Sequence, residues 1–300
     1  MLAGDFRQQV AVPSEEASAH CSGRCVYRST TDKGKTLDRG LWVTWYDLPE
    51  AGRDAHLAWL HGTYIPKMLK KPGVKWAAHY KTDDNFPPLH RLRHTDDPSV
   101  PTGNGYIIMF GGEHAHVFAG FTPFRNDARG SAKDQEMLAM RQGARTAIFT
   151  EEARGEGRDA KKRDRRDSPA PCIQIGSYNA DVKDEDELLS WYAHFRFLAV
   201  SKLPSAIAIR KYVSASGWAK HGVMYEFTSI EDRDRQFRSN EAKDVKTHAW
   251  TTELIPRLLH APGSPNVAQR IWPPVKSAAA KKKSAAKPAK KPAKKAAKRR

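Results

Sequence analysis

The chain has 300 residues, 39% of them apolar, and a formal net charge of +17 at neutral pH. Its length suits two domains of ordinary size, and its apolar content is sufficient for a hydrophobic core. It contains no run of 18 apolar residues, which excludes the usual signature of a membrane-spanning helix. Three cysteines, an odd number, argue against a disulfide framework and favour a reducing compartment. We therefore expect a cytoplasmic protein with no membrane partner.

The first 38 residues show no sustained periodicity. They are rich in Ser, Thr and charge, which predicts a disordered leader over residues 1–38. Within it, Cys21 and Cys25 have a C-x₃-C spacing beside His20, but no second pair follows downstream. A structural zinc site needs four ligands, so this segment does not predict one.

A first folded unit is predicted over residues 39–150. It begins with a strand at 41–47, followed by an amphipathic helix that Pro66 interrupts and Lys71-Pro72-Gly73 ends. A second strand is predicted at 74–81.

The remainder of this unit is less regular. After a long connection, the pattern predicts a third strand at 106–118, a helix at 131–145 and a short strand at 147–150. The highly charged, Pro-bounded residues 151–169 then read as a linker.

A second folded unit is predicted over residues 170–275. Strands are expected at 172–178, 206–213 and 222–227, with an apolar helical stripe between the first two. An exposed helix is expected at 229–240, and the segment 250–272 closes the folded part.

The two units form a near-repeat. Residues of the same type recur 132 positions apart without a gap, namely Tyr46 and Tyr178, Trp59 and Trp191, Pro72 and Pro204, and Tyr80 and Tyr212. Each unit has the strand–helix–strand–strand–helix–strand order of a ferredoxin-like fold. The strands carry large residues on both faces, so each sheet needs cover on both. We predict an α+β protein in which two tandem ferredoxin-like units form one intramolecular α/β barrel.

The first helix also carries a family resemblance. The pattern W-Y-x-x-x-H-x-P, followed by P-G, is typical of the EthD-like group of dimeric α/β-barrel proteins. Trp59, Pro66 and Pro72-Gly73 match it, while Tyr64 stands at the position of the histidine. The resemblance covers residues 40–272 and implies a cavity for a small organic molecule. Relatives include monooxygenases, decarboxylating or cyclising enzymes and plain binding proteins.

Four residues are candidates for catalysis. His79 ends the second strand and could act as an acid or base if it faces a cavity. Arg210 lies near the equivalent place in the second unit. His61 lies beside the apolar stripe of the first long helix, and Tyr64 lies within it. The alternative for His79 is a ring satisfied by a backbone carbonyl, and the alternative for Tyr64 is core packing.

His114 and His116 are candidates for a metal site. In a strand their rings would share one face, but no third ligand is placed by spacing, so no metal is predicted. The chain also contains no G-x-G-x-x-G, P-loop or G-x-S-x-G motif, and no cofactor is predicted.

The positive charge is concentrated at the C-terminus. Residues 277–300 contain eleven lysines and arginines and no acidic residue, and without them the net charge falls from +17 to +6. Lysines spaced by Ala and Pro cannot build a core, so residues 276–300 are predicted to be disordered. The segment resembles the Lys-Ala-Pro tails of linker histones. That resemblance implies non-specific contacts of Lys281–Arg300 with nucleic acid phosphates, and association with the nucleoid.

Two functions follow from these observations. The first is a barrel that binds a small, partly apolar organic molecule and acts as a cofactor-independent enzyme. The second is a non-catalytic barrel tethered to nucleic acid by its basic tail. Convergence of His79, His114 or His116 with Tyr64 or Arg210 on one cavity would favour the first.

Overall fold

A computed structural model describes residues 38–86, 91–119, 130–238 and 249–275. All of them belong to one compact unit, Gly34–Arg300. The predicted leader apart from Asp38, and the predicted tail, lie outside the described residues, as do His20, Cys21 and Cys25. Among the helices in the described ranges, none is long and apolar enough to cross a membrane.

The first half of the chain contributes four long strands. Its elements in order are β1 (Gly40–Asp47), α1 (Arg53–Trp59), the π-helical turn η2 (Leu60–Tyr64), α2 (Ile65–Leu69), β2 (Val74–Thr82), β3 (Arg93–His94), β4 (Tyr106–Gly112), the 3-10 turn η3 (Ala115–Phe118), α3 (Ala132–Ala139) and β5 (Gln142–Glu156).

The second half contributes four more long strands. Its elements are the 3-10 turns η5 (Ala160–Lys162) and η6 (Val182–Asp184), β6 (Cys172–Asn179), α4 (Glu185–Trp191), the π-helical turn η7 (Tyr192–Arg196), α5 (Phe197–Ser201), β7 (Ala206–Ser216), β8 (His221–Phe227), α6 (Ile230–Arg233), the π-helical turn η8 (Asp234–Arg238), α8 (Ala249–Leu254), the 3-10 turn η9 (Ile255–Arg257), β9 (Leu259–His260) and β10 (Asn266–Trp272).

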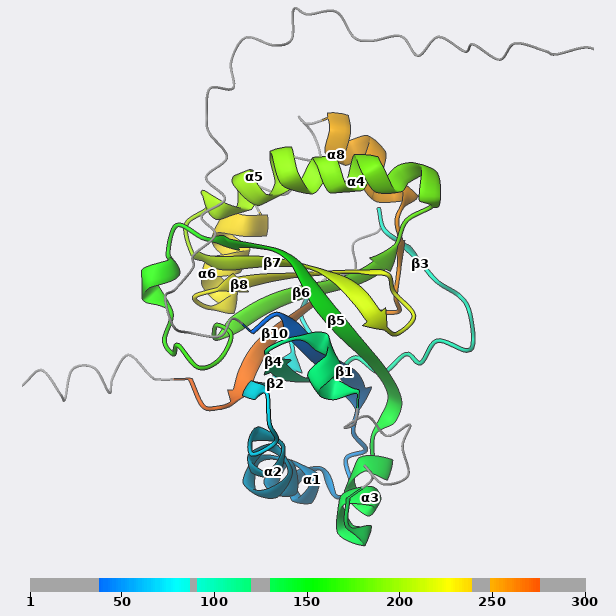
Figure 1. The fold of residues 1–300 in the computed structure, drawn as a ribbon, viewed down its shortest axis with the longest axis vertical. Helices are drawn as coiled ribbons and strands as arrows, with labels where there is room; N and C mark the ends of the chain where they lie inside the picture. Colours follow the sequence, from blue (N-terminus) through cyan, green and yellow to red (C-terminus); the bar gives the residue numbers. More distant parts are fainter. Residues whose placement is uncertain (1–37, 87–90, 120–129, 239–248, 276–300) are drawn as a thin grey trace, which may run out of the picture. The chain divides into compact units, whose positions relative to one another are not determined.

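Eight of these strands close into an antiparallel barrel. Their order is β10-β2-β4-β1-β5-β7-β8-β6, and β6 pairs in turn with β10. The two halves join where β5 pairs with β7 and where β10 pairs with β2. Figure 1 shows α1, α2 and α3 on one side of the barrel and α4, α5 and α8 on the other. The barrel expected from the two-faced strands therefore forms within a single chain.

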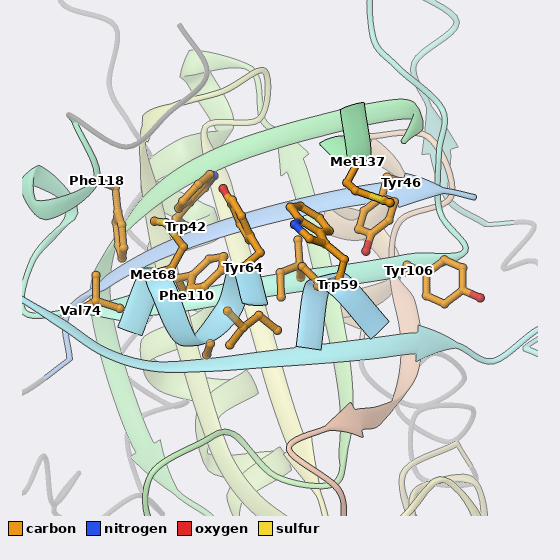
Figure 2. Packing of buried hydrophobic residues seen from close by; sticks show 14 of the residues in the cluster. Trp42, Tyr46, Trp59, Tyr64, Met68, Val74, Tyr106, Phe110, Phe118 and Met137 are labelled. Carbon is orange, nitrogen blue, oxygen red and sulfur yellow. The ribbon is translucent and has the colours of Figure 1, made fainter. Parts of the chain in front are cut away.

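The barrel interior is a packed apolar core. Alternate residues of the strands point inward, as the period of two requires, and Trp45, Tyr80 and Tyr212 are among the large side chains fully buried there. A second apolar layer lies between the outer face of the first-half strands and their helices (Figure 2). A third lies under the helices of the second half. The strands are apolar on both faces because both faces are covered.

Three predicted boundaries are wrong, each because of strand pairing. The strand predicted at 106–118 ends at Gly112, since Gly40 and Val74 at the starts of both neighbouring strands pair with Gly112. The helix predicted at 131–145 ends at Ala139, because Gln142 already pairs with Asp47.

The third boundary concerns the joint between the halves. The strand predicted at 147–150 extends over Gln142–Glu156, since its first part pairs with β1 and its second with β7. Residues 151–156 were predicted to begin a linker on account of their charge. The charges instead pair across strands, as between Glu151 and Arg210.

Interior packing can be tested at Gly111. A Cβ atom there would lie 2.0 Å from the ring of Trp76, which fills the barrel interior against the β4 backbone. We expect Gly111→Ala to lower the free energy of unfolding by about 3 kcal/mol through overpacking. The control is Gly62→Ala, where no atom lies within 4 Å of the added carbon and the position is helical. This change should raise stability by roughly 0.5–1 kcal/mol. Urea unfolding measures both, and equal effects would contradict the described packing.

Candidate active site

The four candidate catalytic residues do not converge on one cavity. His61 and His79 are brought together, whereas Tyr64 and Arg210 lie elsewhere. The convergence on which the enzyme hypothesis was to depend is therefore absent in its predicted form. A different group of residues gathers around His79.

His79 links two side chains through both of its ring nitrogens. Its Nδ1 lies 2.8 Å from Nε2 of His61, and its Nε2 lies 2.9 Å from the hydroxyl of Tyr46. The planes of the His79 and Tyr46 rings are parallel to within 1°. His79 and Tyr46 are fully buried and His61 is half-buried. The three side chains thus form a hydrogen-bonded chain, named the relay below, that leads from the surface to the interior.

Local structure explains why these residues meet. On β2, Ala78 and Tyr80 point into the barrel, so His79 between them points outward to the helical layer. Tyr46 of β1 points to the same layer. The π-helical turn η2 adds one residue to a helical turn and places His61 above His79.

The Tyr46 proton sets the direction of the hydrogen bonds. The Arg141 guanidinium lies 4.5 Å from the centre of the Tyr46 ring. Among the described residues, His79 is the side chain that hydrogen-bonds the Tyr46 hydroxyl. The assignment that pairs the Tyr46 proton has its O–H donating to Nε2 of His79. His79 then donates from Nδ1 to Nε2 of His61, and His61 carries its own proton on Nδ1.

Burial keeps the members of the relay neutral. It lowers the pKa of His79 well below 6.5, with His61 and Arg141 acting in the same direction. It raises the pKa of Tyr46 to about 12, against the pull of Arg141. Burial also lowers the pKa of His61. The relay therefore holds transferable protons without net charge at neutral pH.

Other polar and aromatic groups surround the relay. Trp272 of β10 lies 6.3 Å from the His61 ring, and Tyr106 packs on both Tyr46 and His79. His56 is fully buried against Tyr46. Sequence analysis named Tyr46 only as part of the repeat and missed Arg141, His56, Tyr106 and Trp272 as site residues. The one available signal was the recurrence of tyrosine at positions 46 and 178.

Tyr64 lies in the apolar layer. Its ring is 5.0 Å from Trp59 and 6.4 Å from Phe110. In the view of Figure 2, Trp59 is drawn between Tyr64 and Tyr46. Core packing, the alternative stated for Tyr64, describes these contacts.

Arg210 lies inside one end of the barrel. It donates to Glu151 at 2.6 Å and to the Asp38 carboxylate at 3.0 Å, and its side chain is 4% exposed. Asp38 also accepts from Arg154 and from Trp76. Arg210 is thus held in an ion-pair network, remote from the relay.

His114 and His116 follow β4 instead of lying within it. Both are exposed, and their ring centres are 6.3 Å apart. They line a hollow of about 580 Å³ together with Ile148 and Thr150. This hollow lies at the Gly40 end of β1, whereas Tyr46 lies at the other end. In the described ranges, no cluster of three or more His, Cys, Asp or Glu suited to a metal is found.

The second half has a counterpart of the relay with different chemistry. Tyr178 donates to the hydroxyl of Tyr192 at 2.7 Å. Lys211 takes the position of His79, 132 residues on. Its Nζ contacts Glu152, the backbone oxygen of Tyr212 and Nδ1 of His221, at 3.1–3.3 Å. Three partners satisfy an ammonium group, so this position is occupied by a saturated ion pair.

Comparison with known proteins does not name a family. No protein-family profile matches the chain, and no curated protein matches it. Among solved structures, it is similar to an anthrone oxidase-like protein, with a TM-score of 0.49 and 10% identity over 78% of this chain and 92% of that one. It is also similar to a provisionally assigned monooxygenase from Fusobacterium nucleatum, with a TM-score of 0.48 and 8% identity over 79% and 94%. A chlorite dismutase from Candidatus Nitrospira defluvii has a TM-score of 0.42 and 8% identity over 77% and 90%. These scores lie below 0.5, so the description of the barrel rests on the strand pairing of this chain.

The neutral state of His79 predicts a pH dependence of stability. Between its folded pKa and 6.5 the unfolded chain binds more protons, so this contribution to stability rises with pH and is lost on acidification below 6.5. We expect His79→Gln to be less stable than the wild type at pH 7 and to lose less stability between pH 7 and pH 5. The slopes should differ by up to about 1.4 kcal/mol per pH unit.

Urea unfolding at several pH values measures this difference. The control His116→Gln removes an exposed ring and should follow the wild-type curve. Parallel curves for wild type and His79→Gln would contradict a buried neutral His79.

Proposed function

We propose that the first half of the barrel is a cofactor-independent acid site, in which His61 donates a proton to a small, partly apolar organic molecule. The observation that carries the proposal is the position of His79, buried and hydrogen-bonded on both ring nitrogens. A structural histidine needs one partner to fix its ring. A histidine that links a half-buried imidazole to a buried phenol also provides a path for protons.

The proton balance of the step follows from the assigned hydrogen bonds. The Nδ1–H bond of His61 breaks as the bound molecule gains the proton. Nε2 of His61 takes the Nδ1 proton of His79, and Nε2 of His79 takes the hydroxyl proton of Tyr46. The products are the protonated molecule and a Tyr46 phenolate beside the Arg141 guanidinium, whose charge favours the phenolate. Return of the protons in the opposite order restores the site.

The surroundings of His61 support the proposed kind of ligand. No residue in the described ranges hydrogen-bonds its Nδ1, and the Trp272 ring lies beside it. An accessible proton donor next to an aromatic face suits a small aromatic molecule with a carbonyl oxygen.

The two halves are further proposed to be tandem ferredoxin-like units of the EthD-like kind. The elements α1, η2 and α2 recur as α4, η7 and α5 with the same offset of 132 residues. The strand order β5-β1-β4-β2 in the first half corresponds to β10-β6-β8-β7 in the second. Both observations support duplication of one unit.

Proton donation can be tested with phenylacetone, a neutral aryl ketone. Exchange of its α-hydrogens in D₂O, followed by proton NMR, is accelerated by a proton donor at the carbonyl oxygen. We expect the wild type to accelerate this exchange. In His61→Gln the exchange rate should fall by about 100-fold, the usual size of a general-acid contribution. Tyr46→Phe, which removes the inner end of the relay, should lose about 10-fold, a smaller share of the same effect.

The matched control is Tyr178→Phe. It removes the corresponding tyrosine of the second half, which bonds Tyr192 and not a histidine. This variant should exchange the ketone at the wild-type rate. The proposal fails if the wild type gives no rate above buffer, or if Tyr46→Phe and Tyr178→Phe behave alike.

A barrel tethered to nucleic acid is the second candidate function. Eleven cationic residues without an acid in residues 277–300 favour it. We expect full-length protein to bind duplex DNA at low salt with a steep loss at moderate salt, and a chain ending at Lys276 to bind much more weakly. Equal binding by both chains in a fluorescence titration would assign the affinity to the barrel.

A further inference from the structure

Arg141 is a cation without an anionic partner. No acidic side chain in the described ranges pairs with it, although it is half-buried and lies between the end of α3 and the start of β5. Its guanidinium lies over the ring of Tyr46, 4.5 Å from the ring centre. A desolvated guanidinium normally has a carboxylate, a phosphate or water against its donors.

The unpaired donors of Arg141 lie on one edge. Nε and Nη2 are both enclosed and make no hydrogen bond. These two nitrogens form the side-on fork that receives both oxygens of a carboxylate. The same edge of Arg165 binds Asp167 in this chain, at 2.8 and 2.7 Å. Arg154 uses it on Glu151.

A second unsatisfied side chain contacts the same tyrosine, Tyr46. His56 is 0% exposed, and neither of its ring nitrogens makes a hydrogen bond of normal geometry within the described residues. The Met137 backbone is the one neighbouring group that favours its protonated form, while burial and Arg141 keep its pKa low, at about 4. A neutral imidazole beside a cation can donate one hydrogen bond to an anion that both groups contact.

We propose that Arg141 and His56 form a binding site for a small carboxylate. Two oxygens of the carboxylate accept from Nε and Nη2 of Arg141, and one of them also accepts from a ring nitrogen of His56. The two side chains come from α1 and from the segment between α3 and β5, and both contact Tyr46 of β1. This site goes beyond the proposed acid site, because it requires neither His61 nor His79.

Occupancy of this site has a consequence for the relay. A carboxylate on Arg141 places negative charge close to Tyr46 and reduces the help that Arg141 gives to a Tyr46 phenolate. A bound carboxylate is therefore expected to slow proton donation by His61.

The test uses benzoate as the probe and benzamide as its neutral counterpart of the same shape. Isothermal titration of the full-length protein should show binding of benzoate and at least 10-fold weaker binding of benzamide. Arg141→Gln should lose at least 10-fold in benzoate affinity. Arg141→Lys, which keeps the charge but not the fork, should fall between the two. His56→Phe should weaken benzoate binding by a smaller factor and preserves a buried ring.

The matched control is Arg39→Gln, which removes an exposed arginine at the other end of β1. It should bind benzoate as the wild type does. Near-ultraviolet circular dichroism establishes that each variant is folded. Equal affinity for benzoate and benzamide, an unchanged affinity in folded Arg141→Gln, or the absence of benzoate binding by the wild type would overturn the proposal.

The outcomes separate this site from the acid site. Benzoate binding without exchange of phenylacetone would leave the carboxylate site standing and refute proton donation by His61. Exchange of phenylacetone without benzoate binding would support proton donation by His61 and refute the carboxylate site.

Discussion

The filled interior of the barrel is the constraint on which the other features depend. Large side chains such as Trp45, Tyr80 and Tyr212 occupy the centre and are fully buried. Gly111 lacks a side chain so that the ring of Trp76 can lie against the backbone. A ligand cannot enter a core packed in this way. Buried polar atoms without a hydrogen bond occur in this core, as on Trp45 and Tyr212, and also in the layer beneath the helices, as on His56.

That layer differs between the halves although its framework is the same. Both long helices contain a π-helical turn at matching positions, η2 and η7. Only the first has Pro66, so proline is not the common cause of the turn. The added residue lets each helix bring a polar side chain over the strand below. In the first half this contact joins two histidines, while in the second half Lys211 is closed off by three partners.

The sequence was sufficient to predict most of the strands and the barrel. Hydrophobic periodicity is visible in each segment, and large residues on both faces of a strand indicate that both faces are covered. The prediction failed where pairing partners decided the outcome. His114 and His116 were predicted to lie in a strand, but β4 ends at Gly112, because the two neighbouring strands begin opposite that residue. The charge of residues 151–156 predicted a linker. Glu151 pairs with Arg210, which is 59 residues away, so the pairing could not be predicted from the neighbouring sequence. The sequence identified His61 and His79 as two separate candidates but did not predict their contact. The π-helical turn that brings them together has no recognisable sequence pattern.

The position of Arg141 connects the two proposed sites. A phenol buried as deeply as Tyr46 resists ionisation, and a relay that ends there works only with a positive charge close by. A guanidinium remains charged at any physiological pH, so the charge of Arg141 acts on Tyr46 while its enclosed Nε and Nη2 atoms make no hydrogen bond. In the second half the buried cation is Lys211, which takes the position of His79, and its ammonium group contacts three protein partners. The two unpaired nitrogens of Arg141 thus distinguish the first half from Lys211 in the second. In our proposal, these nitrogens are where an external anion influences proton transfer.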